Sequence, residues 1–342
     1  MKALLETYEI ARELLAWYDK NRRDLPWREN TDPYRVWVSE IMLQQTRVEA
    51  ARGYFIAFLE RFPDVKALAG ADLEAVYKAW EGLGYYSRAR RLWEAAQTVA
   101  KAGAFPQNYS EWIELPGVGA YTAAAIASIC FGERALAVDG NVTRVVMRWW
   151  GMRDFATSPS AKRAVLEAGQ VFLTDGRPGD GNQALMELGA TVCIPGAPRC
   201  ALCPLQASCV GFARGDAAGL PIVPPKKGKS VEQMRVVVAV REGRVLVRVR
   251  PDKGLLAGQW EFPHGLDEDA VRKLGLSELR EIPSYRHVFT HKIWEMTGTV
   301  YRAESFALLE GTCRWVDAQE LSALPIPSAM APFRAAAMEE IA

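Results

Sequence analysis

The spacing of apolar residues predicts helices through most of the N-terminal two-thirds of the chain. Over residues 1–20, apolar side chains such as Leu4, Tyr8 and Leu15 recur at the interval of one helix face. Further stretches with this period follow, and breaks such as Gly82-Leu83-Gly84 separate them. The pattern therefore predicts a mostly α-helical first domain.

One of these helices carries a carboxyl group among apolar side chains. Thr31-Asp32-Pro33 is a helix start, with a capping side chain before a proline, and the helix is expected to continue to Leu43. Within it, Glu40 stands beside Ile41 and other apolar residues. A charge at a helix edge is the commoner reading, but a carboxyl against apolar walls has a raised pKa and can carry a proton at neutral pH. Gln44-Gln45-Thr46 then breaks the apolar pattern, as a polar surface does.

Residues 109–144 are interpreted as helix, tight turn, helix and a short apolar segment that ends in an acid. Leu115-Pro116-Gly117-Val118-Gly119 cannot continue a helix, because Pro116 has no N–H and the two glycines favour a turn. An Ala-rich helix is predicted next, over residues 121–131. The turn leaves N–H groups free at a helix start, where they can bind phosphate, although an ordinary interhelical turn fits the same residues.

The acid that follows the turn helix is Asp139, at the start of a helix predicted over residues 141–150. Asp followed by Gly-Asn is a good N-cap by itself. A fixed carboxylate in this place can also stabilise positive charge that develops in a transition state. The two roles are compatible, because a capping backbone holds the carboxyl group in place.

Four cysteines follow in a C-x6-C-x2-C-x5-C pattern. Four thiols so close together, in a chain without a secretion signal, favour a metal site over disulfides. Zinc is the ordinary occupant of a four-cysteine site, so the residues by themselves do not decide the metal. The four are Cys193, Cys200, Cys203 and Cys209.

The apolar period changes to two beyond a proline- and lysine-rich stretch at residues 220–230. Residues 236–240 and 245–249 flank a short turn and predict a β-hairpin. The elements expected after the hairpin are strands near 285–302 and 312–316 and a helix near 328–341. This part of the chain is therefore predicted to be a separate domain with a sheet.

Length and charge bound these interpretations. The 342 residues fit two domains, which we assign to residues 1–219 and 231–342 with a linker at 220–230. There is no apolar run of membrane-spanning length and no signal-peptide core near the N-terminus, so we expect an intracellular, cytoplasmic protein without a membrane partner. The net charge of +1 means that any nucleic-acid-binding charge must be confined to a local face.

The order of hairpin, acid and four cysteines resembles the helix–hairpin–helix DNA glycosylases of the endonuclease III superfamily, over about residues 8–225. Within that superfamily, the segments SEIMLQQT around Glu40 and GLGYYSRAR around Tyr85 are similar to those of the MutY-like adenine glycosylases. Endonuclease III relatives lack a glutamate at position 40. The resemblance implies a mostly α helix–hairpin–helix domain in which the four cysteines bind a [4Fe–4S] cluster.

The same resemblance implies the roles of several side chains. Glu40 would protonate the adenine, Asp139 would stabilise the sugar cation at C1′, and Tyr121 and Asn141 would line the pocket. Relatives that also cut the strand carry a nucleophilic lysine in the slot of Tyr121, so the resemblance implies base removal without efficient lyase action. The residues implied to contact DNA are Arg28, Leu43, Gln45, Thr46, Tyr85, Gly117, Gly119, Phe289, Thr290 and His291.

The second domain resembles the α/β Nudix fold through LLAGQWEFP, residues 255–263. The catalytic box of Nudix enzymes is missing from residues 265–281, so the domain is expected to recognise rather than hydrolyse. MutY-like proteins sense 8-oxoguanine with a loop that usually reads Phe-Ser-His, and Phe289-Thr290-His291 fills this place. Threonine keeps the hydroxyl group and adds a methyl. The alternative for His291 is a structural histidine at a strand end.

Together these features imply a monomeric, monofunctional adenine DNA glycosylase of base excision repair, acting on double-stranded DNA with adenine opposite 8-oxoguanine or guanine. A thymine–guanine mismatch glycosylase is the first alternative, because it could share Tyr121, the acid at 139 and the cluster. The Nudix-like domain and Gln44-Gln45-Thr46 argue against it. A DNA-binding redox protein that has lost catalysis is the second, and the presence of both Glu40 and Asp139 opposes it.

Overall fold

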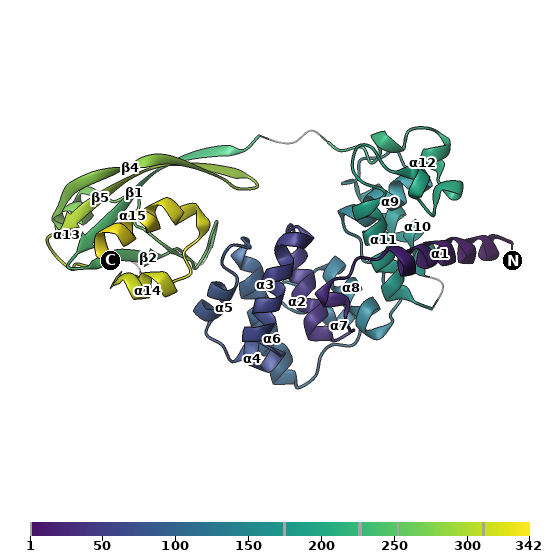
Figure 1. Ribbon diagram of the computed structural model, residues 1–342, viewed down its shortest axis with the longest axis horizontal. Helices are drawn as coiled ribbons and strands as arrows, with labels where there is room; N and C mark the ends of the chain where they lie inside the picture. The colour runs from purple at the N-terminus through teal and green to yellow at the C-terminus, as the bar shows by residue number, and fades with distance from the viewer. Residues whose placement is uncertain (1, 174–175, 225–227, 252, 310–311) are drawn as a thin grey trace. The chain divides into compact units, whose positions relative to one another are not determined.

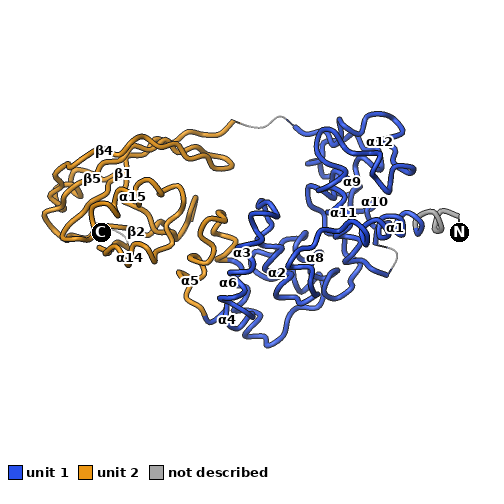
Figure 2. The backbone as a smooth tube through the Cα atoms, in the orientation of Figure 1, with its two compact units in different colours: residues 1–70, 91–225 blue, residues 71–90, 226–342 orange. Residues whose placement is uncertain are grey.

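The computed structural model describes residues 2–173, 176–224, 228–251, 253–309 and 312–342 (Figure 1). They form two compact units, which Figure 2 colours separately. The first unit holds residues 1–70 and 91–225, and the second holds residues 71–90 and 226–342. Residues 71–90 were expected in the helical domain, yet they cluster with the C-terminal part of the chain. The assigned domain boundaries stay a prediction, and residues 225–227 of the assigned linker lie outside the described residues.

The first unit is built from helices, as the apolar period predicted. Helix α6 begins within residues 71–90 and continues into this unit. The helices are α1 (Lys2–Asn21), α2 (Pro33–Leu43), α3 (Val48–Arg61), α4 (Val65–Ala69), α6 (Tyr86–Ala102), α7 (Tyr109–Trp112), α8 (Ala120–Phe131), α9 (Gly140–Trp150), α10 (Pro159–Gly169), α11 (Pro178–Thr191) and α12 (Val210–Ala213). Among the described helices, none combines the length and the apolar character needed to cross a lipid bilayer.

Local sequence signals set the starts of the two helices that matter most for the site. The Asp32 side chain accepts a hydrogen bond from the N–H of Arg35 at 2.9 Å and caps α2, which begins at a proline as expected. Asp139 caps α9 in the same way, through the N–H of Val142 at 2.7 Å. Both predicted caps are therefore confirmed.

Helix α11 contacts α1, α8 and α9, and α8 also contacts α2. A buried apolar cluster with members from α1, α9, α10 and α11 includes Leu14, Val146, Val165 and Leu188. Close approach of α9 and α11 depends on Gly189, because a Cβ atom there would lie 2.6 Å from the Cβ of Asn141. This packing brings α2, α8 and the start of α9 to a common region.

The second unit is a mixed sheet with helices. The strands follow the order β3-β2-β1-β5-β4, with β6 paired to β2. Their bounds are β1 (Ser230–Arg241), β2 (Arg244–Val249), β3 (Trp260–Glu261), β4 (Leu276–Val288), β5 (Lys292–Ala303) and β6 (Cys313–Val316), and the helices are α5 (Leu73–Ala79), α13 (Glu268–Leu274), α14 (Ala318–Ala323) and α15 (Ala331–Ile341).

The predicted hairpin is confirmed, since β1 and β2 pair antiparallel with Val240 opposite Val245. The stretch near 285–302 contains the end of β4, a turn at 289–291 and most of β5. Strand β1 also pairs in parallel with β5 over residues 230–240, which a period of two cannot reveal. Buried side chains such as Val238 and Phe333 join the sheet to α15 in one core. The expected α/β fold of this part of the chain is confirmed.

Candidate active site

Glu40 and Tyr121 meet at the contact between α2 and α8. The tyrosine hydroxyl donates a hydrogen bond to Oε2 of Glu40 at 2.7 Å, and lies 3.5 Å from Sδ of Met186. Glu40 is 7% exposed. Burial raises the pKa of Glu40 to about 7, against the lowering effects of the Tyr121 hydrogen bond and of Arg28. Glu40 therefore exchanges its proton near neutral pH.

Asp139 adds a second carboxyl group to this region. Its negative charge contributes to the raised pKa of Glu40. Burial also raises the pKa of Asp139, while hydrogen bonds from the backbone N–H of Val142 and from the side chain of Asn141 oppose the rise. The pKa of each carboxyl group is therefore raised by burial, and in each case hydrogen-bond donors partly oppose the rise.

A short chain of hydrogen bonds runs from Asp139 toward the first of the four cysteines. The Asn141 amide donates to Asp139 Oδ2 at 2.9 Å, and its carbonyl oxygen accepts from Arg144 at 2.8 Å. Arg144 also donates from Nε to the backbone oxygen of Cys193 at 2.7 Å. The sequence did not suggest Arg144, because neither its spacing nor its neighbours marks a link between the acid and the cysteine loop.

Arg28, a predicted DNA contact, is engaged with a buried acid. Its guanidinium lies 2.9 Å from Oε2 of Glu187, and Arg23 lies 2.6 Å from the other carboxylate oxygen. Glu187 has a fully buried side chain; burial works to raise its pKa, but the two arginines outweigh it and the pKa is lowered. Sequence reasoning missed Glu187 and Arg23, since more than 150 residues separate the partners.

The hairpin has the turn that its glycines predicted. Gly117 has a φ of 78°, and a Cβ atom there would lie 2.6 Å from the Cβ of Arg91. Gly119 is the N-cap of α8 and offers no side-chain acceptor to the first N–H groups of the helix. A Cβ atom at Gly119 would meet open space. These N–H groups are therefore available to an anion.

Two of the predicted DNA contacts, one in each unit, have backbone conformations that side chains rarely adopt. Gln45 has a φ of 56° two residues after the end of α2, and Tyr85 has a φ of 49° directly before α6. Both are exposed. Near Gln45, the N–H of Thr46 bonds to the backbone oxygen of Leu43 at 3.3 Å and closes the turn. A strained, exposed polar residue is a frequent feature of binding sites.

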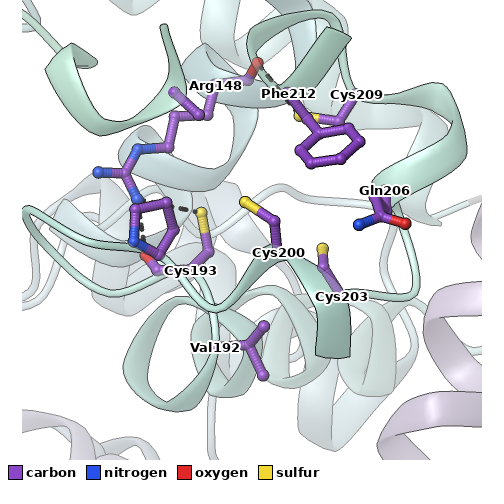
Figure 3. Close-up of a pocket in the computed structure, with 10 residues that line it drawn as sticks. Arg148, Val192, Cys193, Cys200, Cys203, Gln206, Cys209 and Phe212 are labelled. Atoms are coloured by element: carbon purple, nitrogen blue, oxygen red, sulfur yellow. Dashed lines mark hydrogen bonds between the residues drawn. The ribbon is translucent and has the colours of Figure 1, made fainter. Parts of the chain in front are cut away.

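The four cysteines line one cavity of the first unit, together with Arg148 and Phe212 (Figure 3). Figure 3 shows the sulfurs of Cys193, Cys200 and Cys203 turned toward the same space. Arg148 is buried and donates to Sγ of Cys193 at 3.4 Å and to the backbone oxygen of Leu220 at 2.7 Å. This part of the chain thus has a cationic donor beside a set of thiols.

The sulfur positions do not describe a site for one ion. Across the described residues, no three His, Cys, Asp or Glu side chains form a group that could hold a single metal ion. Burial raises the pKa of the Cys203 thiol to about 12 and also raises that of Cys209. Thiols bind metals as thiolates, so metal binding here would release protons.

The turn between β4 and β5 presents Phe289, Thr290 and His291. Phe289 packs edge-on against Trp294 with ring centroids 4.8 Å apart, whereas the other two side chains are exposed. The Thr290 hydroxyl and the hydroxyl of Tyr85 form a hydrogen bond within the second unit. Two residues that the sequence assigned to DNA contact from distant parts of the chain are therefore adjacent.

Comparisons with known proteins identify the family and the fold. Residues 38–170 match the family model of the HhH-GPD superfamily base excision DNA repair proteins, and residues 235–336 match that of the NUDIX domain. A solved thermostable thymine-DNA glycosylase is 27% identical with a TM-score of 0.55, covering 62% of this chain and 99% of its own. An endonuclease III in a non-covalent complex with DNA, 20% identical with a TM-score of 0.52 and covering 62% and 97%, shares the fold. The class is thus a helix–hairpin–helix base excision repair protein with a C-terminal Nudix domain.

Three relatives narrow this class. The adenine DNA glycosylase of Homo sapiens is 33% identical, covering 96% of this chain and 76% of the relative. That of Mus musculus is 36% identical, covering 93% and 75%, and that of Buchnera aphidicola subsp. Acyrthosiphon pisum is 31% identical, covering 86% and 87%. The chain belongs to the adenine DNA glycosylase family. The family and fold expected from the sequence are therefore confirmed.

Proposed function

We propose that this protein is a monofunctional adenine DNA glycosylase that removes adenine paired with 8-oxoguanine or guanine in double-stranded DNA during base excision repair. The observation that carries the proposal is a pair of carboxyl groups whose pKa values burial raises, Glu40 hydrogen-bonded to Tyr121 at 2.7 Å and Asp139 hydrogen-bonded to Asn141 at 2.9 Å. A binding protein has no need of either group. The three relatives described above are each named adenine DNA glycosylase, which supports the adenine part of the proposal.

In this proposal Glu40 is the general acid. Adenine leaves poorly as an anion, and protonation at the ring nitrogen N7 turns it into a neutral leaving group. A pKa of about 7 gives a mixture of protonated and ionised Glu40 at neutral pH. The same group can therefore donate its proton to the base and later accept one from the attacking water.

Asp139 stabilises the positive charge that develops at C1′ as the bond to the base breaks, or bonds to C1′ briefly. The N–H of Val142 and the amide of Asn141 hold both of its oxygens, so the carboxylate needs no reorganisation during the reaction. Tyr121 and Asn141 line the pocket beside the two acids.

Residue 121 is a tyrosine and not a lysine, which supports base removal without strand cleavage. A phenol cannot form a Schiff base with C1′, and the hydroxyl of Tyr121 is engaged with Glu40. The abasic product is therefore released uncut.

DNA is the proposed partner of three surfaces, and the protein acts on it inside the cell as a monomer. The N–H groups at the start of α8 bind a phosphate, and Gln45 and Tyr85 fill the stack near the opposite base. The turn with Phe289, Thr290 and His291 reads that base. The hydrogen bond between Tyr85 and Thr290 supports this, because it joins a stacking residue to a reading residue. We assign catalysis to residues 1–219, a linker to 220–230 and lesion recognition to 231–342, with Tyr85 contributed from outside that last range.

A [4Fe–4S] cluster is the proposed occupant of the cysteine cavity. Four thiols line it, and four cysteine thiolates are the usual ligands of such a cluster. Base excision transfers no electrons, so the bound cluster would supply a rigid link between the chain segments around it. The thiols of Cys193, Cys200, Cys203 and Cys209 would hold it, and Arg148 would donate to the Cys193 sulfur.

The experiment is single-turnover excision on matched duplexes with A:8-oxoguanine, A:G, T:G and A:T pairs. Adenine release from the first two, with little from the others, supports the proposal. Thymine release from T:G would replace it with a thymine–guanine mismatch activity; the solved relative is named a thymine-DNA glycosylase. Binding to all four duplexes without release of any base would instead support a DNA-binding protein that has lost catalysis.

A further inference from the structure

The second unit contains a segment from the middle of the helical sequence, and polar contacts join this segment to the sheet and its helices. Glu74 accepts a hydrogen bond from the indole of Trp260 at 2.9 Å. Lys78 donates to the backbone oxygen of Ser322 at 2.8 Å. These contacts fix α5 against β3 and against the end of α14.

A third connection is an ion pair between Glu81 and Arg334 of α15. Arg334 Nη1 lies 2.9 Å from Glu81 Oε1, while Lys78 lies 2.6 Å from the other carboxylate oxygen. Arg334 also donates to the backbone oxygens of Leu321 and Ser322. The two paired side chains are only about a quarter exposed, at 24% and 26%, so water screens the pair less than it would on an open surface.

A short turn connects Glu81 of this ion pair to Tyr85, a predicted DNA contact. The indole of Trp80 donates to the backbone oxygen of Gly84 at 3.1 Å, and Arg88 donates to the same oxygen at 3.2 Å. The Arg88 guanidinium also lies 5.4 Å from the centre of the Tyr85 ring. Polar contacts within the turn thus hold its backbone between Glu81 and Tyr85.

The far end of the turn is Tyr85 itself. Its φ of 49° is an unfavourable conformation for a side chain of this size, and 43% of the residue is exposed. Its hydroxyl bonds to Thr290 in the turn between β4 and β5. One end of the segment is therefore bound to α15 and the other to the predicted reading turn.

We propose that the Glu81–Arg334 ion pair is a specificity-determining contact that positions Tyr85 against Thr290, so that the lesion reader is assembled from residues 71–90 and the Nudix-like sheet together. The inference rests on the proposed function, since it assigns a role in discriminating 8-oxoguanine from guanine. Glu81 and Arg334 act through Tyr85 and do not touch the DNA. They are positioning residues, and their loss moves the reader without altering the pair of carboxyl groups.

The test measures the ratio of single-turnover excision rates on A:8-oxoguanine and A:G with saturating enzyme. Glu81→Ala and Arg334→Ala should each lower this ratio about 2- to 5-fold, the range expected for one partly exposed ion pair, and the double variant should do no more than either single one. Glu81→Gln keeps an acceptor for Arg334 and should lose less. The rate on A:G should stay near that of the wild-type protein.

Arg280→Ala is the matched control. Arg280 also forms ion pairs with α15, to Glu339 and Glu340, and its described hydrogen bonds stay on that helix. The control should keep the wild-type ratio. If Glu81→Ala also keeps it, or if Arg280→Ala loses it equally, the positioning role is wrong. A wild-type protein that excises adenine equally from both pairs would instead overturn the proposed 8-oxoguanine recognition, which separates the two failures.

Discussion

The burial of Glu40 has one consequence for catalysis and another for folding stability. Burial makes it an acid at neutral pH, yet the same burial makes its ionised form unfavourable in the folded chain. Tyr121 limits this cost by donating to the carboxyl group. The catalytic side chain is therefore also a source of pH-dependent stability.

Replacing Glu40 by glutamine tests its catalytic part. The amide cannot donate an acidic proton, so single-turnover excision of adenine should fall at least ~10²-fold while DNA binding persists. Glu49→Gln, on the exposed start of α3, is the control and should leave the rate unchanged. Near-normal turnover of Glu40→Gln would remove this residue from the mechanism.

A pH series tests the protonation state. Excision that needs protonated Glu40 should slow as the pH rises through about 7. Stability follows the same proton. Because the pKa rises from 4.5 in a free glutamate to about 7 in the folded chain, folding stability present below the lower value is lost as the pH approaches the higher one.

The Glu40→Gln variant has no carboxyl group at this position, so it should not lose folding stability in this way as the pH rises. Its thermal unfolding midpoint, measured against the wild-type protein, should therefore be relatively higher at pH ~8 than at pH ~4. An identical difference between the two proteins at both pH values would show that Glu40 is not protonated by folding.

Nearby residues in the sequence indicated both acids. Glu40 is a charge within an apolar helix, and Asp139 is an acid before a helix start. Glu187 has no such signal. Its partners Arg23 and Arg28 become neighbours only when α11 packs beside the start of the chain, so no pattern of nearby residues could predict the pair.

Among the elements, the hairpin before α8 was predicted from local chemistry alone, since Pro116 and two glycines restrict the backbone. The parallel pairing of β1 with β5 was not predicted. A strand pattern states which side chains face a core and leaves the identity of the neighbouring strand open. The same limit applies to the return of residues 71–90 to the sheet.

Gly117→Ala tests the hairpin. Alanine at a φ of 78° is strained, and its Cβ would lie 2.6 Å from the Cβ of Arg91, so stability should fall by about 1–3 kcal/mol. Gly119→Ala meets no protein atom within 4 Å and should leave stability nearly unchanged. If the N–H groups bind phosphate, both variants should weaken DNA affinity.

Thermal unfolding and DNA titrations separate these effects. Gly53→Ala, which also meets no atom within 4 Å, is the control for a glycine change in a helix. Full DNA affinity in Gly119→Ala would argue against phosphate contact at the start of α8.

The cysteine loop makes a different prediction. Protein purified without oxygen should contain iron and absorb near ~400 nm, and Cys203→Ser should lower the iron content. Cys130→Ser, outside the cavity, is the control and should keep the iron. Stoichiometric zinc in place of iron by elemental analysis would exclude the cluster.

At the scale of the whole molecule, deletion of residues 231–342 removes more than the reading turn. It also removes Trp260, Ser322 and Arg334, the partners of residues 71–90. The truncated protein should therefore still excise adenine, but its preference for A:8-oxoguanine over A:G should fall more than in Thr290→Ala. That single change loses one neutral hydrogen bond and should shift the ratio only about 5-fold.

The measurement is the ratio of excision rates for the full chain, the truncated chain and Thr290→Ala. An unchanged ratio after truncation would contradict lesion reading by the second unit. Equal loss in the truncated chain and in Thr290→Ala would mean that the hydroxyl carries the whole preference and that residues 71–90 add nothing.

The discontinuity of the second unit also orders events during synthesis. Ribosomes work from the N-terminus, so residues 71–90 emerge before the whole of residues 91–225, and only then does the sheet that binds them follow. Contacts between such distant parts of a chain form late. The hairpin and both carboxyl groups can therefore be complete while the reader is still unfinished. A chain interrupted after residue 225 would therefore contain the groups that remove adenine but would lack the sheet that reads the base opposite it.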